Sequence, residues 1–365
     1  MPTLHSGVGQ QPGFIVVDAG GREFGPGTDW LLQLVANDCS RHTVRAYAMS
    51  LLRPRITSRT VQPQTAPDRP RQHGPGPGYG EPFLHPDTGE LVTLPAPVQD
   101  LCDHFLSLAE QELPTGLLTG LYLHGGLVFG EWAPRESDVD FVATLARRPE
   151  PAEVEALRGL HAQMVAYSSI RFDGPHVLAA DLARDPRTLS PVPEMIPTRK
   201  LEILVSPSRM ITWHELAQAG ITVTGPELST LQIWTDKQAL HDYTVDNLDT
   251  YWRSNAEGLA RATLADLPTD QRERDYLLTH CILASVRLHH LLVTGEMTAK
   301  SRAGHWALTH YDERWHRVLT EGLRLRDATG TSGYADQADL LADVRDFLAH
   351  VVETATGKPV APTNA

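Results

Sequence analysis

The sequence predicts an α+β domain, in which helices surround a small mixed sheet, followed by an all-α C-terminal domain. The first sign of the sheet is residues 121–145, which indicate a strand, a glycine turn, a short helix and a second strand. A further apolar strand is predicted at residues 200–205. From about residue 231 the pattern is helical, most clearly over 276–293. The chain therefore divides into a sheet-forming part and a later helical part.

Residues 1–53 form a separate small unit. Residues 14–18 predict a strand, while 29–35 and 40–47 predict helices, the second with Ser40 as its N-cap. The phrase SRHTVRAYAMSLLR, starting at Ser40, resembles the opening of the DNA-holding helical domain of tyrosine recombinases. The arginine, histidine and tyrosine set of a recombinase catalytic domain does not follow it. We therefore expect a fused helical fragment without recombinase activity, with a generic helix pair as the alternative.

Residues 54–97 predict a flexible, disordered linker. Prolines and glycines crowd together there, as in QHGPGPG, and the apolar periodicity vanishes. Such a segment cannot bury enough apolar surface to offset the entropy lost on ordering.

The predicted sheet domain spans residues 98–230. It opens with a helix whose apolar residues recur three and four apart from Val98. The elements predicted after residue 145 are an amphipathic helix at 151–169, a strand at 175–180, a proline-rich loop at 185–197, the strand at 200–205, a helix at 212–219 and a turn at 224–226.

The predicted helical domain spans residues 231–355. Its last helix, at 335–354, is amphipathic, so we expect it to pack against the rest of the domain. Residues 356–365 are assigned to a tail.

Asp138 and Asp140 are two carboxylates on one face of the strand that ends the 121–145 stretch, because residues two apart share a face. Bringing them together is costly unless a cation lies between them, and Mg²⁺ prefers such oxygen ligands. Gly125 and Gly126 allow the backbone to approach a phosphate closely, before a helix N-terminus that favours anions. The pattern points to a nucleoside triphosphate, although an isolated Asp-x-Asp pair is more often a solvated turn.

Glu202 is embedded in the apolar strand at 200–205. A carboxylate in that setting is costly unless it is paired or binds a metal. The alternative is an exposed edge strand with Glu202 in water.

The composition of the 365 residues limits the functional classes. With 45 acidic and 32 basic residues the net charge is −13, which argues against nucleic acid as a partner and suits a cationic substrate, unless it only maintains solubility. We see no signal peptide or membrane-length apolar run, so we expect a cytoplasmic protein without a membrane partner. Three widely spaced cysteines fit that compartment.

The glycine turn, Gly130 and the Ser137–Asp140 motif together resemble the signature of the nucleotidyltransferase superfamily. Residues 98–355 resemble the aminoglycoside adenylyltransferases that modify streptomycin and spectinomycin, and their close homologues. The resemblance implies a nucleotidyltransferase domain and a helical domain with the active site between them, in a protein that we expect to be a monomer. The implied reaction is transfer of AMP from ATP to a hydroxyl of a small cationic aminoglycoside or aminocyclitol, with two Mg²⁺ ions.

The same resemblance assigns the site residues. Asp138, Asp140 and Glu202 would hold the metal, and Glu202 would be the general base. Arg287 and Lys300, in the segment TGEMTAK, would bind the nucleotide phosphates with the Gly125–Gly126 turn.

Two departures from the family pattern concern the phosphates and the substrate. Gly126 replaces a serine that usually follows the first glycine. The acid that holds aminoglycoside amines in relatives falls on Leu277, so we expect Glu273 and Asp275 to serve instead. Two alternatives therefore remain open: a nucleotidyltransferase acting on another small molecule or a protein, and a degenerate, non-catalytic homologue.

Overall fold

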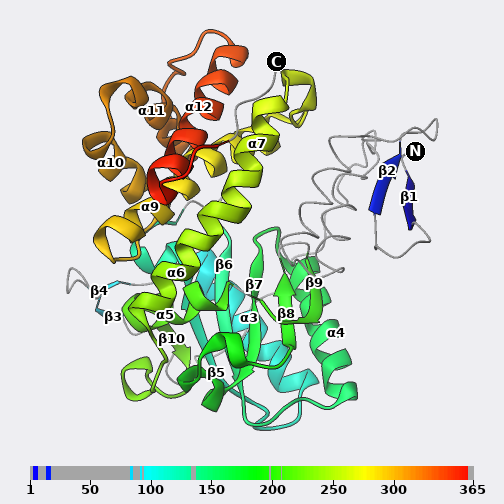
Figure 1. Cartoon of the computed structure of the whole chain (residues 1–365). Helices are drawn as coiled ribbons and strands as arrows, with labels where there is room; N and C mark the ends of the chain where they lie inside the picture. Colours follow the sequence, from blue (N-terminus) through cyan, green and yellow to red (C-terminus); the bar gives the residue numbers. More distant parts are fainter. Residues whose placement is uncertain are drawn as a thin grey trace. The chain divides into compact units, whose positions relative to one another are not determined.

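The computed structural model describes residues 3–6, 14–17, 83–84, 91–92, 94–132, 137–196, 199–206 and 208–360. The chain forms two compact units, Met1–Pro82 and Phe83–Ala365. Figure 1 shows the elements of each unit.

The first unit contains one described strand pair. Strand β1 (Thr3–Ser6) pairs antiparallel with β2 (Phe14–Val17). The strand predicted at 14–18 is thereby confirmed. The predicted helices at 29–35 and 40–47 lie outside the described residues.

A six-stranded mixed sheet is the centre of the second unit. Its strands, in spatial order, are β10 (Ile221–Thr224), β5 (Leu118–His124), β6 (Val139–Leu145), β7 (Phe172–Leu178), β8 (Val192–Ile196) and β9 (Lys200–Leu204). Strands β6 and β7 run parallel, and the other neighbouring pairs are antiparallel. The predicted small mixed sheet is confirmed.

Two proline-containing regions differ from the sequence predictions. Strand β7 begins at Phe172 rather than at residue 175. The proline-rich segment 185–197 contains a short turn of helix, η3 (Pro186–Thr188), and strand β8. Prolines suggested breaks in both places, but a proline in a strand removes only its own N–H donor and keeps its carbonyl acceptor.

The end of the predicted linker also forms secondary structure. Strands β3 (Phe83–Leu84) and β4 (Leu91–Val92) pair antiparallel. Helix α3 (Ala96–Glu112) begins before residue 98, with Pro95 as its N-cap residue and Ala96–Pro97 in its first turn. A proline there costs little, because the first helical N–H groups have no intrahelical acceptor.

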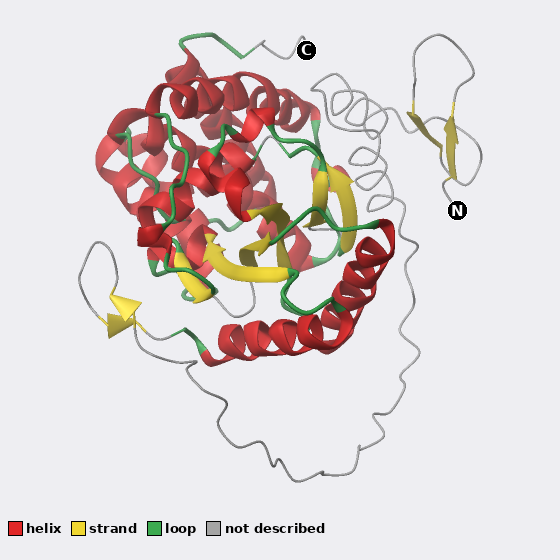
Figure 2. Cartoon of the chain, turned by 90° about the horizontal axis from the view of Figure 1, so that it is seen from below, coloured by secondary structure: helices red, strands yellow, loops and turns green. Residues whose placement is uncertain are grey.

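Helices pack on both faces of the sheet (Figure 2). On one face lie α3 and α4 (Pro151–Tyr167), where the fully buried Phe105 packs against Phe141 and Phe172. On the other lies α5 (Arg209–Ala219), whose buried Trp213 belongs to the same core cluster as Val142. Burying both faces fixes the direction in which each strand residue points.

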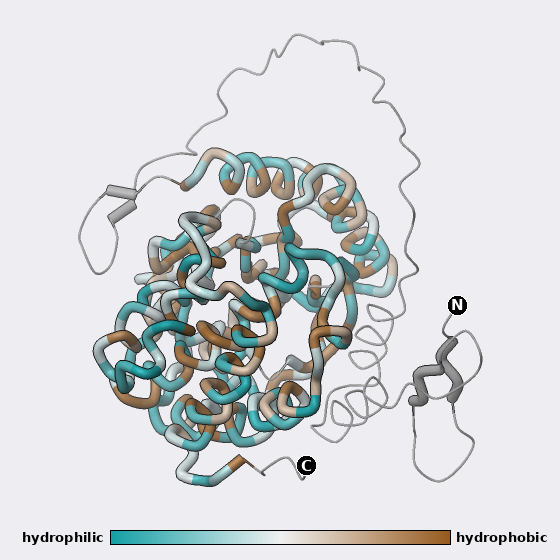
Figure 3. Tube along the Cα trace, turned by 90° about the horizontal axis from the view of Figure 1, so that it is seen from above, coloured by the Kyte–Doolittle hydropathy of each residue, from teal (hydrophilic) through white to brown (hydrophobic). Residues whose placement is uncertain are grey.

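The rest of the second unit is an all-α domain with its own core, as predicted. Figure 3 shows apolar and polar stretches alternating along its helices, as amphipathic packing requires. The helices are α6 (Lys237–Asn247), α7 (Arg253–Arg261), α8 (Gln271–Thr279), α9 (Ser285–Thr294), α10 (Lys300–His310), α11 (His316–Asp327) and α12 (Gln337–Thr356). The π turn η5 (Leu248–Trp252) joins α6 to α7, and η7 (His280–Ala284) joins α8 to α9. Shorter helical turns are η1 (Gly125–Phe129), η2 (Ala179–Ala183), η4 (Leu228–Thr230), η6 (Leu264–Asp266) and η8 (Glu313–Trp315).

One helix in the described part of the chain has the length and composition of a membrane span. This is the stretch Gln271–Thr294. Just over half of its most apolar part, 56%, is buried inside the protein, and its apolar side chains contribute to the helical core. The match is therefore weak evidence for a membrane location.

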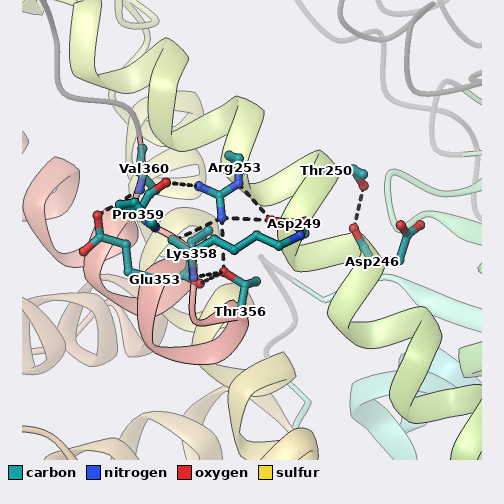
Figure 4. Close-up of polar contacts among 10 residues, drawn as sticks. Asp246, Asp249, Thr250, Arg253, Glu353, Thr356, Lys358, Pro359 and Val360 are labelled. Atoms are coloured by element: carbon teal, nitrogen blue, oxygen red, sulfur yellow. Dashed lines mark hydrogen bonds and ion pairs between the residues drawn. The ribbon is translucent and has the colours of Figure 1, made fainter.

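The residues after α12 are held against α7, although the sequence assigned them to a tail (Figure 4). Arg253 donates hydrogen bonds to the carbonyl oxygens of Pro359, at 2.7 Å, and Lys358, at 3.1 Å. Glu353 accepts the N–H of Val360 at 2.9 Å. These contacts attach the end of the last helix to the first helices of the same domain.

Substitution of Gly174 in β7 tests how closely the parallel strands β6 and β7 pack. A Cβ added there would lie 1.9 Å from the carbonyl oxygen of Phe141 in β6. We expect Gly174→Ala to lower the free energy of unfolding by about 2 kcal/mol, because the strands must separate. Gly159→Ala, at an open position in α4, should instead raise it by about 0.5–1 kcal/mol. Urea denaturation measures both changes; a Gly174→Ala protein as stable as the wild type would contradict this packing.

Candidate active site

The glycine turn lies directly against one of the predicted metal-binding carboxylates. Gly125 follows strand β5 with φ at 75°, and a Cβ there would lie 2.1 Å from Asp140 Oδ2. Position 125 therefore requires glycine both for its backbone angle and for space. Gly126 differs, because its nearest neighbour would be the carbonyl oxygen of Glu131 at 3.8 Å. A serine would fit at position 126.

The sheet register places Asp140 between two other polar residues. His124 of β5 is its partner on one side, and Asp173 of β7 is its partner on the other. All three side chains therefore project from the same face of the sheet. Asp173 was not among the predicted site residues, because the strand was expected to begin at residue 175.

Asp138 lies just before β6 and shares the face of Asp140. Arg171, just before β7, donates a hydrogen bond to Asp138 Oδ2 at 2.5 Å. The N–H of Val139 also donates to the carbonyl oxygen of Arg171 at 2.9 Å. The two strand starts are thus joined by both backbone and side-chain contacts, and Arg171 neutralises part of the acidic charge.

Burial and mutual repulsion make the acidic group costly without a cation. Burial and the charge of Asp138 raise the pKa of Asp140 to about 7, although His124 opposes the shift. Burial likewise raises the pKa of Asp173 to about 7, against the opposing charge of Arg171. Both carboxylate oxygens of Asp173 are buried and accept no hydrogen bond within the described part of the chain.

These acceptors suit a divalent metal. Asp138, Asp140 and Asp173 offer the oxygen ligands that Mg²⁺ prefers. No three acidic, histidine or cysteine side chains among the described residues already form a closed metal-binding group, and Arg171 contacts Asp138 directly. A cation would therefore bind with local adjustment of Arg171.

A buried ion pair between His124 and Glu215 contacts the start of the glycine turn. Glu215 of α5 lies 2.9 Å from His124 Nδ1 and accepts the N–H of Gly125 at 3.2 Å. Burial alone would lower the pKa of His124, but its bond to Glu215 and the charge of Asp140 raise it. The charged pair fixes the end of β5 and the start of the glycine turn.

The predicted phosphate-binding cations come from the helical domain. Burial and the charge of Arg287 lower the pKa of Lys300 to about 8, while Asp138 and Asp140 act in the opposite direction. The positive charge of Arg287 also contributes to lowering the pKa of the buried carboxyl of Glu215. Lys300 is therefore close enough to Asp138 and Asp140 to interact with them electrostatically, and Arg287 is close enough to Glu215.

A small pocket lies beside Lys300 and is lined by Tyr276, Thr279, His280 and Arg326. Thr279 ends α8 and His280 begins the π turn η7. Such turns often occur at functional positions in helices. The pocket places a polar and aromatic surface next to the predicted phosphate site.

The structure corrects the prediction for Glu202. Strand β9 is the edge strand of the sheet, separated from β6 by β7 and β8. Glu202 pairs with Glu194 of β8, on the same face as Asp140. Three strand spacings amount to roughly 14 Å, farther than the two side chains can span. The half-buried Glu202 therefore cannot share a metal with Asp140, and Asp173 takes the position predicted for it.

The two acids predicted to bind the substrate lie at the start of α8. Glu273 is exposed in the first turn of the helix, whose N-cap is Asp270. Asp275 is half-buried and accepts a hydrogen bond from Gln271 Nε2 at 2.6 Å. The last residue of the same helix, Thr279, lines the pocket beside Lys300. The substrate role of Glu273 and Asp275 stays a prediction.

The raised pKa of Asp140 gives a stability prediction. Because the carboxyl is protonated more readily in the folded than in the unfolded protein, stability should fall as pH rises from about 4 through about 7. Without divalent cations at pH 8, Asp140→Asn should therefore stabilise the protein by about 1–3 kcal/mol, and the gain should shrink toward pH 4.

Thermal unfolding with a chelator, repeated across this pH range, measures the effect. Asp346→Asn, at an exposed position on α12, is the control and should leave stability unchanged. An Asp140→Asn protein less stable than the wild type at pH 8 would contradict the electrostatic account.

Among solved structures, the chain is similar to spectinomycin adenyltransferase AAD(9) from Enterococcus faecialis, crystallised with ATP and spectinomycin. The identity is 14%, with 68% of this chain and 98% of that chain covered and a TM-score of 0.48. It is also similar to a toxin-antitoxin structure with AMP-PNP, at 15% identity over 42% of this chain and 90% of the other, with a TM-score of 0.20. A third similar structure is that of the toxin-antitoxin MntA-HpeT mutant D39ED41E. The identity is 14% over 42% of this chain and 89% of that chain, with a TM-score of 0.19.

The family comparison concerns the helical domain. No curated protein matches the sequence. Residues 254–353, however, match the model of the aminoglycoside adenylyltransferase C-terminal domain. This segment carries Arg287 and Lys300, whose assignment came from the same resemblance. This part of the helical domain is therefore similar to the C-terminal domain of aminoglycoside adenylyltransferases.

Proposed function

We propose that the protein transfers AMP from ATP to a hydroxyl group of an aminoglycoside or aminocyclitol, of the streptomycin and spectinomycin type. The observation that carries the proposal is the pairing of Asp140 with Asp173 in the sheet, within the electrostatic reach of Lys300 from the helical domain. The family match of the helical domain supports the same reaction class.

The proposed cofactor is Mg²⁺, held by Asp138, Asp140 and Asp173. A bound divalent ion of this kind neutralises phosphate charge and orients the attacking and leaving oxygens. Arg287 and Lys300 would bind the triphosphate, where their charges offset the negative charge that develops on the departing pyrophosphate. The backbone of the Gly125–Gly126 turn would approach the phosphates from the sheet side.

Asp173 replaces Glu202 as the proposed general base. It would accept the proton of the substrate hydroxyl while that oxygen forms a bond to the α-phosphorus and the bond to the β-phosphate oxygen breaks. Both of its carboxylate oxygens accept no hydrogen bond within the described part of the chain, so one oxygen could hold the metal while the other accepts the proton.

The substrate class rests on charge. The net charge of −13 favours a cationic ligand, and Glu273 and Asp275 would bind its amines at the start of α8. A cytoplasmic enzyme of this kind would confer antibiotic resistance. A different hydroxyl-bearing acceptor is the second candidate, because two basic residues, Lys300 and Arg326, line the pocket.

Replacing each of the two candidate bases by its amide, in separate variants, tests the proposal. We expect Asp173→Asn to reduce turnover at least about 100-fold, because it removes the proton acceptor. The matched change Glu202→Gln, on the same face of the sheet, should alter turnover less than about threefold, since β9 is remote from Asp140. Mass spectrometry of AMP-modified streptomycin and spectinomycin measures both.

Each possible result has a separate meaning. The reverse order of the two effects would restore Glu202 as the base. Wild-type protein that binds Mg-ATP but modifies neither drug would favour the second candidate, and wild-type protein that does not bind Mg-ATP would favour a non-catalytic homologue.

A further inference from the structure

Glu131 connects the glycine turn to the helix that begins with Lys300. It follows Gly130 at the end of the turn η1, and its own N–H donates to the carbonyl oxygen of Gly126 at 3.2 Å. Its side chain is only 18% exposed and extends to the helical domain. One residue thus contacts both elements that the sequence assigned to phosphate binding.

The carboxylate of Glu131 caps helix α10. Its Oε1 accepts the N–H of Arg302 at 2.9 Å, and its Oε2 accepts the N–H of Ser301 at 3.1 Å. These belong to the first helical N–H groups, which lack acceptors within the helix. The N-cap residue of α10, Ala299, has no side chain that could serve. A segment far away in the sequence therefore supplies the cap.

Arg326 of α11 completes the contact. Its guanidinium lies 3.1 Å from Glu131 Oε2 and also donates to the Ser301 hydroxyl at 3.1 Å. Both carboxylate oxygens of Glu131 are therefore occupied, and the side chain has one defined position. A charge-assisted contact of this kind, mostly shielded from water, is strong enough to orient what it holds.

We propose that Glu131 is a positioning residue for nucleotide binding, which sets Lys300 relative to the Gly125–Gly126 turn. Lys300 is the first residue of α10, so the cap on the next two N–H groups fixes where its side chain begins. The role rests on the proposed function, because Lys300 must bind phosphate for its placement to matter. Glu131 itself, as an anion, would touch neither the phosphates nor the substrate.

Glu321 supplies a matched control. Its buried carboxylate also accepts a backbone N–H, from Gly333 at 3.0 Å, and pairs with an arginine, Arg324, at 2.8 Å. It lies within the helical domain and contacts none of the proposed phosphate-binding residues. Glu321→Gln therefore removes the same kind of interaction without affecting Lys300.

Titration calorimetry of the full-length protein with Mg-ATP, together with thermal unfolding, tests the proposal. Glu131→Gln should weaken binding by about tenfold, and Glu131→Asp, which keeps the charge on a shorter chain, should weaken it less. Glu321→Gln should lower the melting temperature but change the dissociation constant less than about twofold. When Lys300 is already replaced by alanine, Glu131→Gln should raise the dissociation constant for Mg-ATP by less than about twofold further. The reason is that Glu131 would act on binding only through Lys300.

Two results would overturn the role of Glu131 alone: unchanged binding in both Glu131 variants, or a full tenfold effect that persists in the Lys300→Ala background. Wild-type protein that does not bind Mg-ATP would overturn the proposed function and this role together.

Discussion

Repulsion between buried carboxylates is the constraint on which the candidate site depends. Asp140 and Asp173 are register partners on adjacent strands, and Asp138 lies at the start of the same strand as Asp140. Removing such groups from water costs several kcal/mol each unless opposite charge compensates. The protein partly supplies that charge through Arg171 and His124. The remaining imbalance is what a divalent cation and the cations of the helical domain would offset.

This constraint accounts for the role that we propose for the helical domain. The sheet provides acids and a glycine turn, whereas Arg287 and Lys300 come from the helical domain. Their relative placement is held by polar contacts as well as by packing. Glu131 caps α10, and the side chain of Gln218 exchanges two hydrogen bonds with the backbone of Met297 just before that helix. The proposed nucleotide binding would therefore depend on the contact between the two domains.

Much of the arrangement could be predicted from local sequence patterns. The alternation around Asp138 and Asp140 indicated a shared face, and the apolar periods gave the helices and most strands. Lys300 was identified only through family resemblance. Strand order, by contrast, is a property of the whole fold. The sequence shows Glu202 in an apolar strand but does not show that β7 and β8 separate it from Asp140.

Asp173 and Glu131 were missed for different reasons. Pro175 suggested that β7 began late, which left Asp173 outside the predicted strand. Glu131 has no local signal, because its partners Ser301 and Arg326 follow 170 and 195 residues later. In the proposed function, acids of the sheet and cations of the helical domain form one metal-dependent nucleotide site. Titration of the full chain with a non-hydrolysable ATP analogue, first with Mg²⁺ and then with a chelator, tests whether this site exists. We expect binding with Mg²⁺ that is lost or greatly weakened in the chelator; equal affinity in both conditions, or no binding with Mg²⁺, would show that there is no such site.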